Sequence, residues 1–210
     1  MPLIRKSGKD TPPKTESAQP SDILRALVNG DADARWSAAR SAGDLPGGVE
    51  ALANALPAER DARVREAMLT SLARIASPQC VNAIVPLLRL DDASVRTAAL
   101  DALRAMPDAV RAQLPALLRD GDSDVRILSC EIARTLPRAD ATALLGDVLA
   151  SEPEANVCAA AIEVLAEVGG PEALPALDRC AARFADSAFL KFAIDIARGR
   201  IQAQSTESHG

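Results

Sequence analysis

The most regular feature of the chain is an acidic residue followed three positions later by an apolar residue, at nearly even intervals. The clearest copies are Asp61-Ala-Arg-Val64, Asp92-Ala-Ser-Val95 and Asp122-Ser-Asp-Val125. With the more degenerate copies included, the apolar residues, here called anchors, stand 30 to 32 residues apart and are Ala34, Val64, Val95, Val125, Val157 and Phe189. Six copies at so even a spacing predict an internal repeat.

Each repeat is predicted to hold two helices. The second helix starts at the acidic residue, whose side chain can accept hydrogen bonds from the free N–H groups of the first turn. Apolar residues return three or four, seven or eight and eleven positions after each anchor, which places them on one helical face. The first helices are expected over residues 22–29, 49–56, 79–89, 108–119, 139–150 and 172–183. Within them Pro86, Pro115 and Pro175 predict a repeated kink or a late helix start.

The composition agrees with an all-α chain. Hydrophobic residues make up 48% of the sequence, but aromatic residues make up only 2%. Sheet-rich folds depend on β-branched and aromatic residues, whereas the abundant Ala, Leu and Arg of this chain favour helices. The composition therefore argues against a β-sandwich or a β-barrel.

The repeat resembles a known family. The pattern Asp-x-x-Val-Arg-x-x-Ala-x-x-Ala-Leu, complete at residues 92–103 and followed by Pro or Gly, is similar to the HEAT-like repeat. Its length is similar to that of the short bacterial variety seen in phycobilisome-lyase-type proteins. The resemblance implies a right-handed α-solenoid of about six HEAT-like helix pairs. The units would span residues 21–47, 48–77, 78–107, 108–137, 138–169 and 170–201.

The two ends of the chain differ from the repeats. Residues 1–20 are basic and rich in proline and are expected to form a flexible tail, and the polar residues 202–210 are expected to fray. The net charge is −5, and the body without its tails is more acidic still, which argues against nucleic-acid binding. No apolar run is long enough for a membrane span or a secretory signal, so we expect a cytoplasmic protein with no membrane partner.

Few residues could carry catalysis. The single histidine, His209, lies in the predicted C-terminal tail, and there is no tyrosine, so a Ser-His-Asp or Cys-His mechanism would lack its base. The four cysteines fall in different units, which favours buried, inert thiols over a zinc site. We therefore predict no catalytic residue, no cofactor and no metal. The resemblance alone suggests an alternative, a bilin-lyase-type activity on a bound tetrapyrrole.

The arginine that follows the anchor has two interpretations. It is present in the first four units as Arg35, Arg65, Arg96 and Arg126. The resemblance implies that this arginine and the turn aspartate form a ladder between neighbouring units, and the alternative is a basic row that binds a ligand. Because the row ends at Cys158 and Leu190, a ladder should weaken in the last two units.

Candidate partner-binding residues lie on the exposed side of the second helices, which the resemblance places on the concave face of the solenoid. Six positions after the anchors of units three to six stand the acidic residues Asp101, Glu131, Glu163 and Asp195. Trp36 and Ile127 follow their anchors by two positions, where a large apolar residue is unexpected. The alternatives are a solvated acidic face, in which three of the acids pair with arginines three positions on, and a structural contact for Trp36.

Together these features predict a non-enzymatic scaffold that binds a protein or peptide on the concave face, for example as an accessory in bacterial signalling. The acidic body favours a basic segment as the ligand, either in the partner or in the protein's own N-terminal tail. The aromatic residues Phe184, Phe189 and Phe192 of the last unit are expected to seal the open end of the stack.

Overall fold

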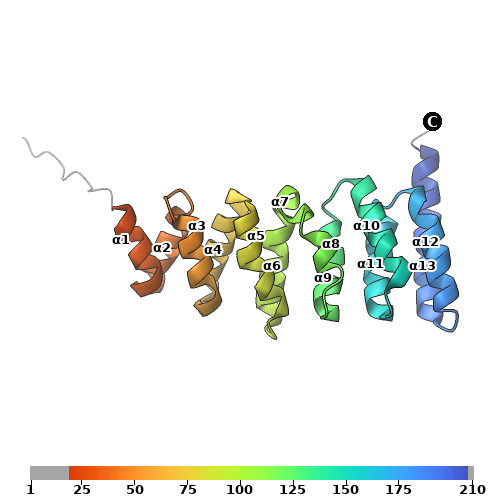
Figure 1. Ribbon diagram of the computed structural model, residues 1–210, viewed down its shortest axis with the longest axis horizontal. Helices are drawn as coiled ribbons and strands as arrows, with labels where there is room; N and C mark the ends of the chain where they lie inside the picture. Colours follow the sequence, from red (N-terminus) through yellow and green to blue (C-terminus); the bar gives the residue numbers. More distant parts are fainter. Residues whose placement is uncertain (1–18, 208–210) are drawn as a thin grey trace, which may run out of the picture.

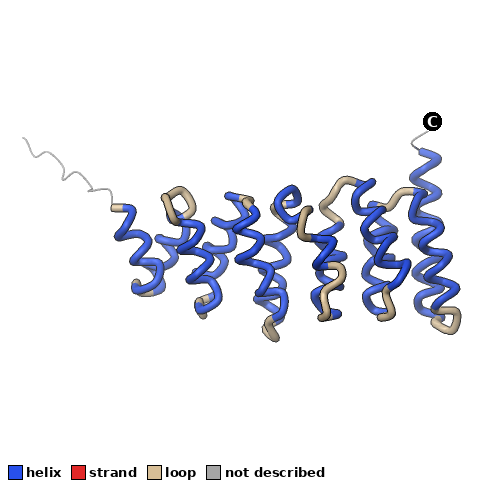
Figure 2. The backbone as a smooth tube through the Cα atoms, viewed as in Figure 1, coloured by secondary structure: helices blue, strands red, loops and turns tan. Residues whose placement is uncertain are grey.

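Helix pairs follow one another along the chain in a single row, from α1 at one end to α13 at the other (Figure 1). The computed structural model describes residues 19–207, in which the chain forms helices and loops but no strand (Figure 2). Most of the predicted N-terminal tail lies outside the described residues. Over the described range no helix combines the length and the apolar character needed to cross a membrane.

The second helices of the six units form one layer. They are α2 (Ala32–Ala42), α4 (Ala62–Ile75), α6 (Ala93–Arg104), α9 (Ser123–Ala133), α11 (Ala155–Val168) and α13 (Ala188–Glu207). Each of them contacts the next along the row, from α2 on α4 to α11 on α13. The layer is therefore continuous, and its solvent-exposed side is here called the second-helix face.

The first helices form the other layer and are broken wherever proline falls inside them. They comprise α1 (Pro20–Asn29), α3 (Gly48–Ala55) with η1 (Leu56–Ala58), α5 (Pro78–Ile84) with η2 (Val85–Arg89), α7 (Pro107–Arg111) with α8 (Leu114–Leu117), α10 (Arg138–Ser151), and η3 (Pro171–Ala173) with α12 (Leu174–Arg183). Pro86 and Pro115 each stand one residue after the start of the new segment, and Pro175 stands just inside α12. The predicted kinks are confirmed, because proline lacks an N–H and is tolerated only in the first turn of a helix.

Aspartate caps the second helices of the first four units, as the motif predicts. The carboxylate of Asp61, for example, accepts hydrogen bonds from the N–H groups of Arg63 and Val64, at 2.9 and 3.1 Å. In the last two units the prediction is wrong. Glu154 makes no side-chain cap bond, and the hydroxyl of Ser187, rather than Asp186, accepts from the N–H of Leu190. Short side chains reach the first-turn amides best, which explains the loss at the longer glutamate.

Replacing the capping aspartate should therefore be costly only where the cap bond exists. We expect Asp61→Ala to lower the free energy of unfolding by about 1 kcal/mol, because two amides of the first turn of α4 lose their acceptor. Glu154→Ala, at the equivalent place in α11, is the matched control and should change stability by a few tenths of a kcal/mol at most. Urea-induced unfolding measures both, and equal losses would contradict the assignment.

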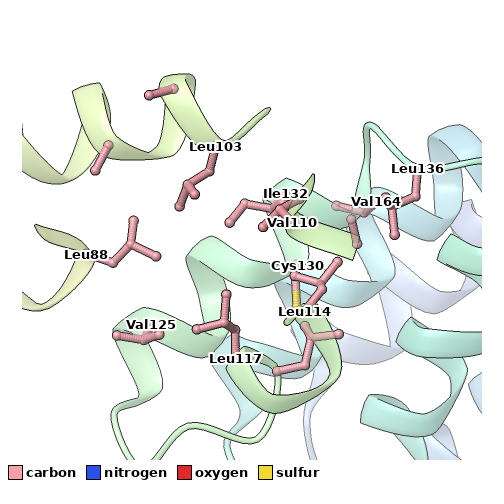
Figure 3. Packing of buried hydrophobic residues seen from close by; sticks show 14 of the residues in the cluster. Leu88, Leu103, Val110, Leu114, Leu117, Val125, Cys130, Ile132, Leu136 and Val164 are labelled. Carbon is pink, nitrogen blue, oxygen red and sulfur yellow. The ribbon is translucent and has the colours of Figure 1, made fainter. Parts of the chain in front are cut away.

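The buried side chains form one core that continues between the two layers along the whole row. Figure 3 shows its middle, where Leu88 and Leu103 of the third unit pack toward Val110 and Ile132 of the fourth and Val164 of the fifth. All four cysteines are buried in the core, at different places along the row. Burial raises the pKa of the Cys130 thiol to about 12. The cysteines are thus buried side chains, as predicted.

The C-terminal end of the row departs from the prediction in two ways. First, α13 continues to Glu207 instead of ending near residue 201, and the side chain of Gln204 receives a hydrogen bond of 2.7 Å from Arg138. Second, Phe189 and Phe192 do not seal the stack. They are 64% and 68% exposed, because they lie on the same side of α13 that the other second helices turn to solvent.

Candidate functional site

Trp36 lies on α2 at the N-terminal end of the second-helix face, half-buried and packed against the core. The guanidinium groups of Arg40 and Arg63 lie over its ring, 4.7 and 5.2 Å from the ring centre. Arg63 comes from α4 of the next unit and also pairs with Asp33 of the first. Trp36 therefore makes the inter-repeat contact that was one of its two predicted roles, stabilised by cation–π attraction.

The same ring lines a groove between α2 and α4. This hollow has a volume of about 500 Å³, and its lining also includes Arg40, Arg74, Glu66 and Thr70. A second hollow of about 480 Å³ lies between α4 and α6, and Glu66 and Thr70 line this one too. The two hollows thus form one surface across three helices, here called the α2–α4–α6 groove.

Small side chains create the second half of this groove. Ala73, Ala98, Ala102 and Ala105 line it, and alanine leaves space between α4 and α6 that a larger residue would fill. Asp101 lines it as well. Neither Asp101 nor Glu66 has an ion pair within residues 19–207, although Asp101 was expected to pair with Arg104. The groove therefore presents two exposed carboxylates that belong to no ion pair of the described residues, together with Arg65, whose guanidinium donates to backbone carbonyls.

The remaining acids of the predicted column are in different surroundings. Glu131 is half-buried and forms an ion pair with Arg134 at 3.0 Å, and Asp195 forms one with Arg198 at 3.2 Å. Glu163 is exposed and has no ion pair in the described part of the chain. The column is therefore neutralised in part by arginines of the same helices, as the alternative interpretation proposed for these two acids.

Arg134 extends this pairing to the next unit. Its guanidinium contacts Glu131 of α9 and Glu167 of α11, and this contact holds the pKa of Glu167 below its ordinary value. Ile127, the second apolar candidate, is half-buried and packs against the core. Of the predicted partner-binding residues, only Trp36 and Asp101 line the α2–α4–α6 groove.

The arginine after the anchor binds backbone carbonyls of the loop before its own helix. Arg65 reaches the carbonyls of Glu59 and Arg60, and Arg96 reaches that of Leu90. Only in the first and fourth units does it also pair with the next unit, and the partner there is a glutamate instead of the predicted turn aspartate. These pairs are Arg35–Glu59 and Arg126–Glu152, at 2.8 and 2.9 Å.

The position of these glutamates explains why the ladder is interrupted. Glu59 and Glu152 each stand five residues before an anchor, where the third unit has Leu90. Arg65 therefore meets no carboxylate there, and among residues 19–207 no ion pair joins the second unit to the third. Where the pair forms, as in Arg35–Glu59, the arginine lowers the pKa of Glu59 and so keeps its carboxylate charged.

In the fifth unit an arginine from the following unit replaces the missing one. Cys158 occupies the position after the anchor, and Arg183 of α12 reaches back to the same loop. Its guanidinium donates to the carbonyls of Leu149, Ala150 and Glu152 at 2.9 to 3.0 Å and lies 3.8 Å from Cys158 Sγ. Arg183 of the sixth unit therefore compensates for the arginine that the fifth unit lacks, and the joint between these two units is not weakened as expected.

The helices form two layers, and each helix pair contacts the pairs next to it along the row. This arrangement defines a helical repeat solenoid. Residues 49–114 and 110–189 match the family model of HEAT repeats, so the chain belongs to the HEAT-repeat family. The family resemblance drawn from the repeat motif is thus confirmed. No curated protein sequence matches the chain.

Solved structures of the same fold include Mini spindles TOG3 of Drosophila melanogaster, which is 16% identical with a TM-score of 0.55 over 87% of this chain and 94% of that one. A HEAT-like repeat protein from Thermococcus onnurineus is 15% identical with a TM-score of 0.49, over 87% and 88% of the two chains. The complex of CpcE and CpcF of phycocyanin lyase from Nostoc sp. is 18% identical with a TM-score of 0.39, over 96% and 99%. At 16% identity the likeness to Mini spindles TOG3 shows the fold alone.

Proposed function

We propose that the protein is a non-enzymatic scaffold that binds an extended basic segment of a protein partner in the α2–α4–α6 groove. The observation that carries this proposal is the continuity of the groove from Trp36 to Asp101, with Glu66 shared between its two halves. An extended peptide can follow such a surface across several repeats and gain affinity from each of them.

The chemistry of the groove favours a basic ligand at its α4–α6 end. Glu66 and Asp101 are exposed carboxylates with no ion pair in the described residues, so a lysine or arginine of the partner could pair with them. Of the arginines that line the Trp36 end, Arg63 pairs with Asp33 and Arg74 pairs with Asp44, whereas Arg40 lies over the Trp36 ring and has no ion pair among residues 19–207. Trp36 offers a large rigid ring, the kind of side chain that dominates binding energy at interfaces.

Peptide binding to the full chain tests this proposal. We expect a fluorescent peptide of alternating lysine and alanine to bind, and its glutamate–alanine counterpart not to bind, as measured by fluorescence anisotropy. Reversing both charges with Glu66→Lys and Asp101→Lys should weaken binding of the lysine peptide by more than about tenfold, which corresponds to about 1.4 kcal/mol. Trp36→Ala should weaken it by a similar factor.

A matched control separates the groove from the overall charge. Glu163→Lys reverses an exposed carboxylate on the same face but outside the groove, and a lysine peptide held in the groove should bind this variant nearly as well as the wild type. Equal losses in Glu163→Lys and Asp101→Lys would show a non-specific charge effect and overturn the proposal. If neither peptide binds, the proposal is also wrong, and visible absorption on mixing with a tetrapyrrole would test the lyase alternative.

A further inference from the structure

The sequence that precedes α1 has a basic half and a mixed half, both outside the described residues. In residues 1–9 every charged side chain is basic, namely Arg5, Lys6 and Lys9. Residues 10–18 hold two acids, Asp10 and Glu16, against the single basic residue Lys14. The charge of this sequence, here called the N-terminal segment, therefore becomes more positive with distance from α1.

The α2–α4–α6 groove changes its charge in the same direction. Arg40 lines its α2 end, whereas Glu66 and Asp101 are exposed in its α4–α6 half and have no ion pair within residues 19–207. Arg65 also lines that half, but its guanidinium donates to backbone carbonyls. Since α1 forms the end of the row next to α2 (Figure 1), the N-terminal segment meets the α2 end first. Its basic half would then lie beside the carboxylates.

Two adjacent prolines stand close to the boundary between the two halves. Pro12 and Pro13 favour polyproline II, the extended conformation that aromatic-lined grooves bind. The aromatic residue of the groove is Trp36, the single tryptophan of the chain. Pro13 stands six positions before Gln19, and six extended residues span about 20 Å. Since packed helices lie about 8–10 Å apart, this length is enough to pass from α1 to the exposed side of α2.

The spacing of the lysines fits the spacing of the helices. In polyproline II the rise is about 3.1 Å per residue, so Lys9 and Lys6 would lie about 9 and 19 Å beyond Pro12. Helices α2, α4 and α6 contact one another in turn, and packed helices lie about 8–10 Å apart, so α4 and α6 stand one and two such steps beyond α2. The two lysines would therefore lie over Glu66 of α4 and Asp101 of α6.

We propose that residues 5–13 of the N-terminal segment occupy the α2–α4–α6 groove of their own molecule and compete there with the partner. The inference rests on the proposed function, because it assigns an internal competitor to the same groove. A ligand tethered by a short linker acts at an effective concentration in the millimolar range, so a weak contact of the segment is enough to hold back a partner. The groove is thus autoinhibited, and a basic segment of the partner has to displace the chain's own.

Energy transfer from Trp36 to an acceptor dye at residue 7 of the full chain tests the contact directly. The dye is attached through Ser7→Cys, which labels selectively because the four cysteines of the chain are buried. We expect transfer in the labelled chain that does not depend on protein concentration. Glu66→Lys with Asp101→Lys should lower it, whereas Glu163→Lys, which reverses an exposed carboxylate outside the groove, should leave it unchanged.

Binding of the lysine–alanine peptide measures the consequence of the contact. Replacing the basic half by Arg5→Gln, Lys6→Gln and Lys9→Gln should raise the affinity of the full chain for this peptide by about tenfold, because the tethered competitor is lost. Lys14→Gln is the matched control. It removes a charge between the prolines and α1 and should leave the affinity nearly unchanged.

The outcomes separate this inference from the proposed function. If the peptide binds the wild type and the triple variant equally, the groove binds a partner but the N-terminal segment does not occupy it, and the inference is wrong. If the peptide binds neither chain, the proposed function fails, and energy transfer still decides whether the segment lies in the groove. Equal transfer in Glu163→Lys and in Glu66→Lys with Asp101→Lys would overturn the inference in either case, as would transfer that rises with protein concentration.

Discussion

Replacing Arg126 by alanine is expected to lower the free energy of unfolding by about 3–5 kcal/mol, because the change leaves the carboxylate of Glu152 buried without its charge partner. The two side chains are only 12% and 6% exposed. They meet through two parallel hydrogen bonds, Nε to Oε2 at 2.9 Å and Nη2 to Oε1 at 3.0 Å. Arg126 also donates to the carbonyl of Asp120 at 2.8 Å, so its loss affects two units at once.

Two comparisons make the Arg126 prediction specific. Arg119 and Asp147 join the same two units, but they are 4.0 Å apart and 70% and 71% exposed. Arg119→Ala should therefore cost no more than a few tenths of a kcal/mol. The double variant Arg126→Met with Glu152→Leu should be less destabilised than either single alanine variant, because no buried charge remains. Chemical unfolding measures all of these, and equal losses for Arg126→Ala and Arg119→Ala would contradict the prediction.

The second large effect is expected at Arg183. Its guanidinium satisfies three carbonyls at the end of the fifth unit's first helix and the following loop, and Arg183→Ala should cost about 2–3 kcal/mol, since bonds to a charged donor are stronger than neutral ones. Arg179 lies one turn earlier on α12, and its exposed side chain has no ion pair within residues 19–207. Arg179→Ala is the matched control and should be nearly neutral.

A second readout shows whether Arg183 holds the last unit in place. Amide hydrogen exchange in α13 should become faster in Arg183→Ala and stay unchanged in Arg179→Ala, because only Arg183 ties the sixth unit to the fifth through these carbonyls. Unchanged protection of α13 in Arg183→Ala would show that core packing and the hydrogen bonds of Gln204 fix the last joint without Arg183.

The fold was predictable because its determinants are local. The aspartate cap, the apolar positions after each anchor and the prolines of the first helices all act within one helix, so their spacing along the chain fixes the six pairs. The partners of the arginines were not predictable in the same way. They depend on a loop one unit further on, where Glu59 and Glu152 replace the expected aspartate, although their shared place five residues before an anchor was a readable signal.

The candidate site was predictable only in part. Trp36 could be chosen because a large apolar residue is unexpected on an exposed helix face, and Asp101 because it belongs to a column of acidic residues six positions after the anchors. The groove between them could not, because it arises from missing side-chain volume at alanines on two different helices. Glu66, which lies in both halves of the groove, stands two positions after its anchor as Trp36 does, and this shared register was the signal for it. Glu131 and Asp195 are not unpaired acids, because each forms an ion pair with the arginine three positions further on.

The interruption of the arginine ladder at Leu90 has a consequence for how the molecule comes apart. In a repeat stack, stability is the sum of each unit's own energy and the contacts with its two neighbours, so the weakest joint decides where cooperativity ends. The first and second units are joined by Arg35–Glu59 and the fourth and fifth by Arg126–Glu152. Within residues 19–207 no ion pair joins the second unit to the third, and these two units pack across an alanine-lined groove. Unfolding under mild denaturant should therefore release the first two units as a block while the last four remain folded.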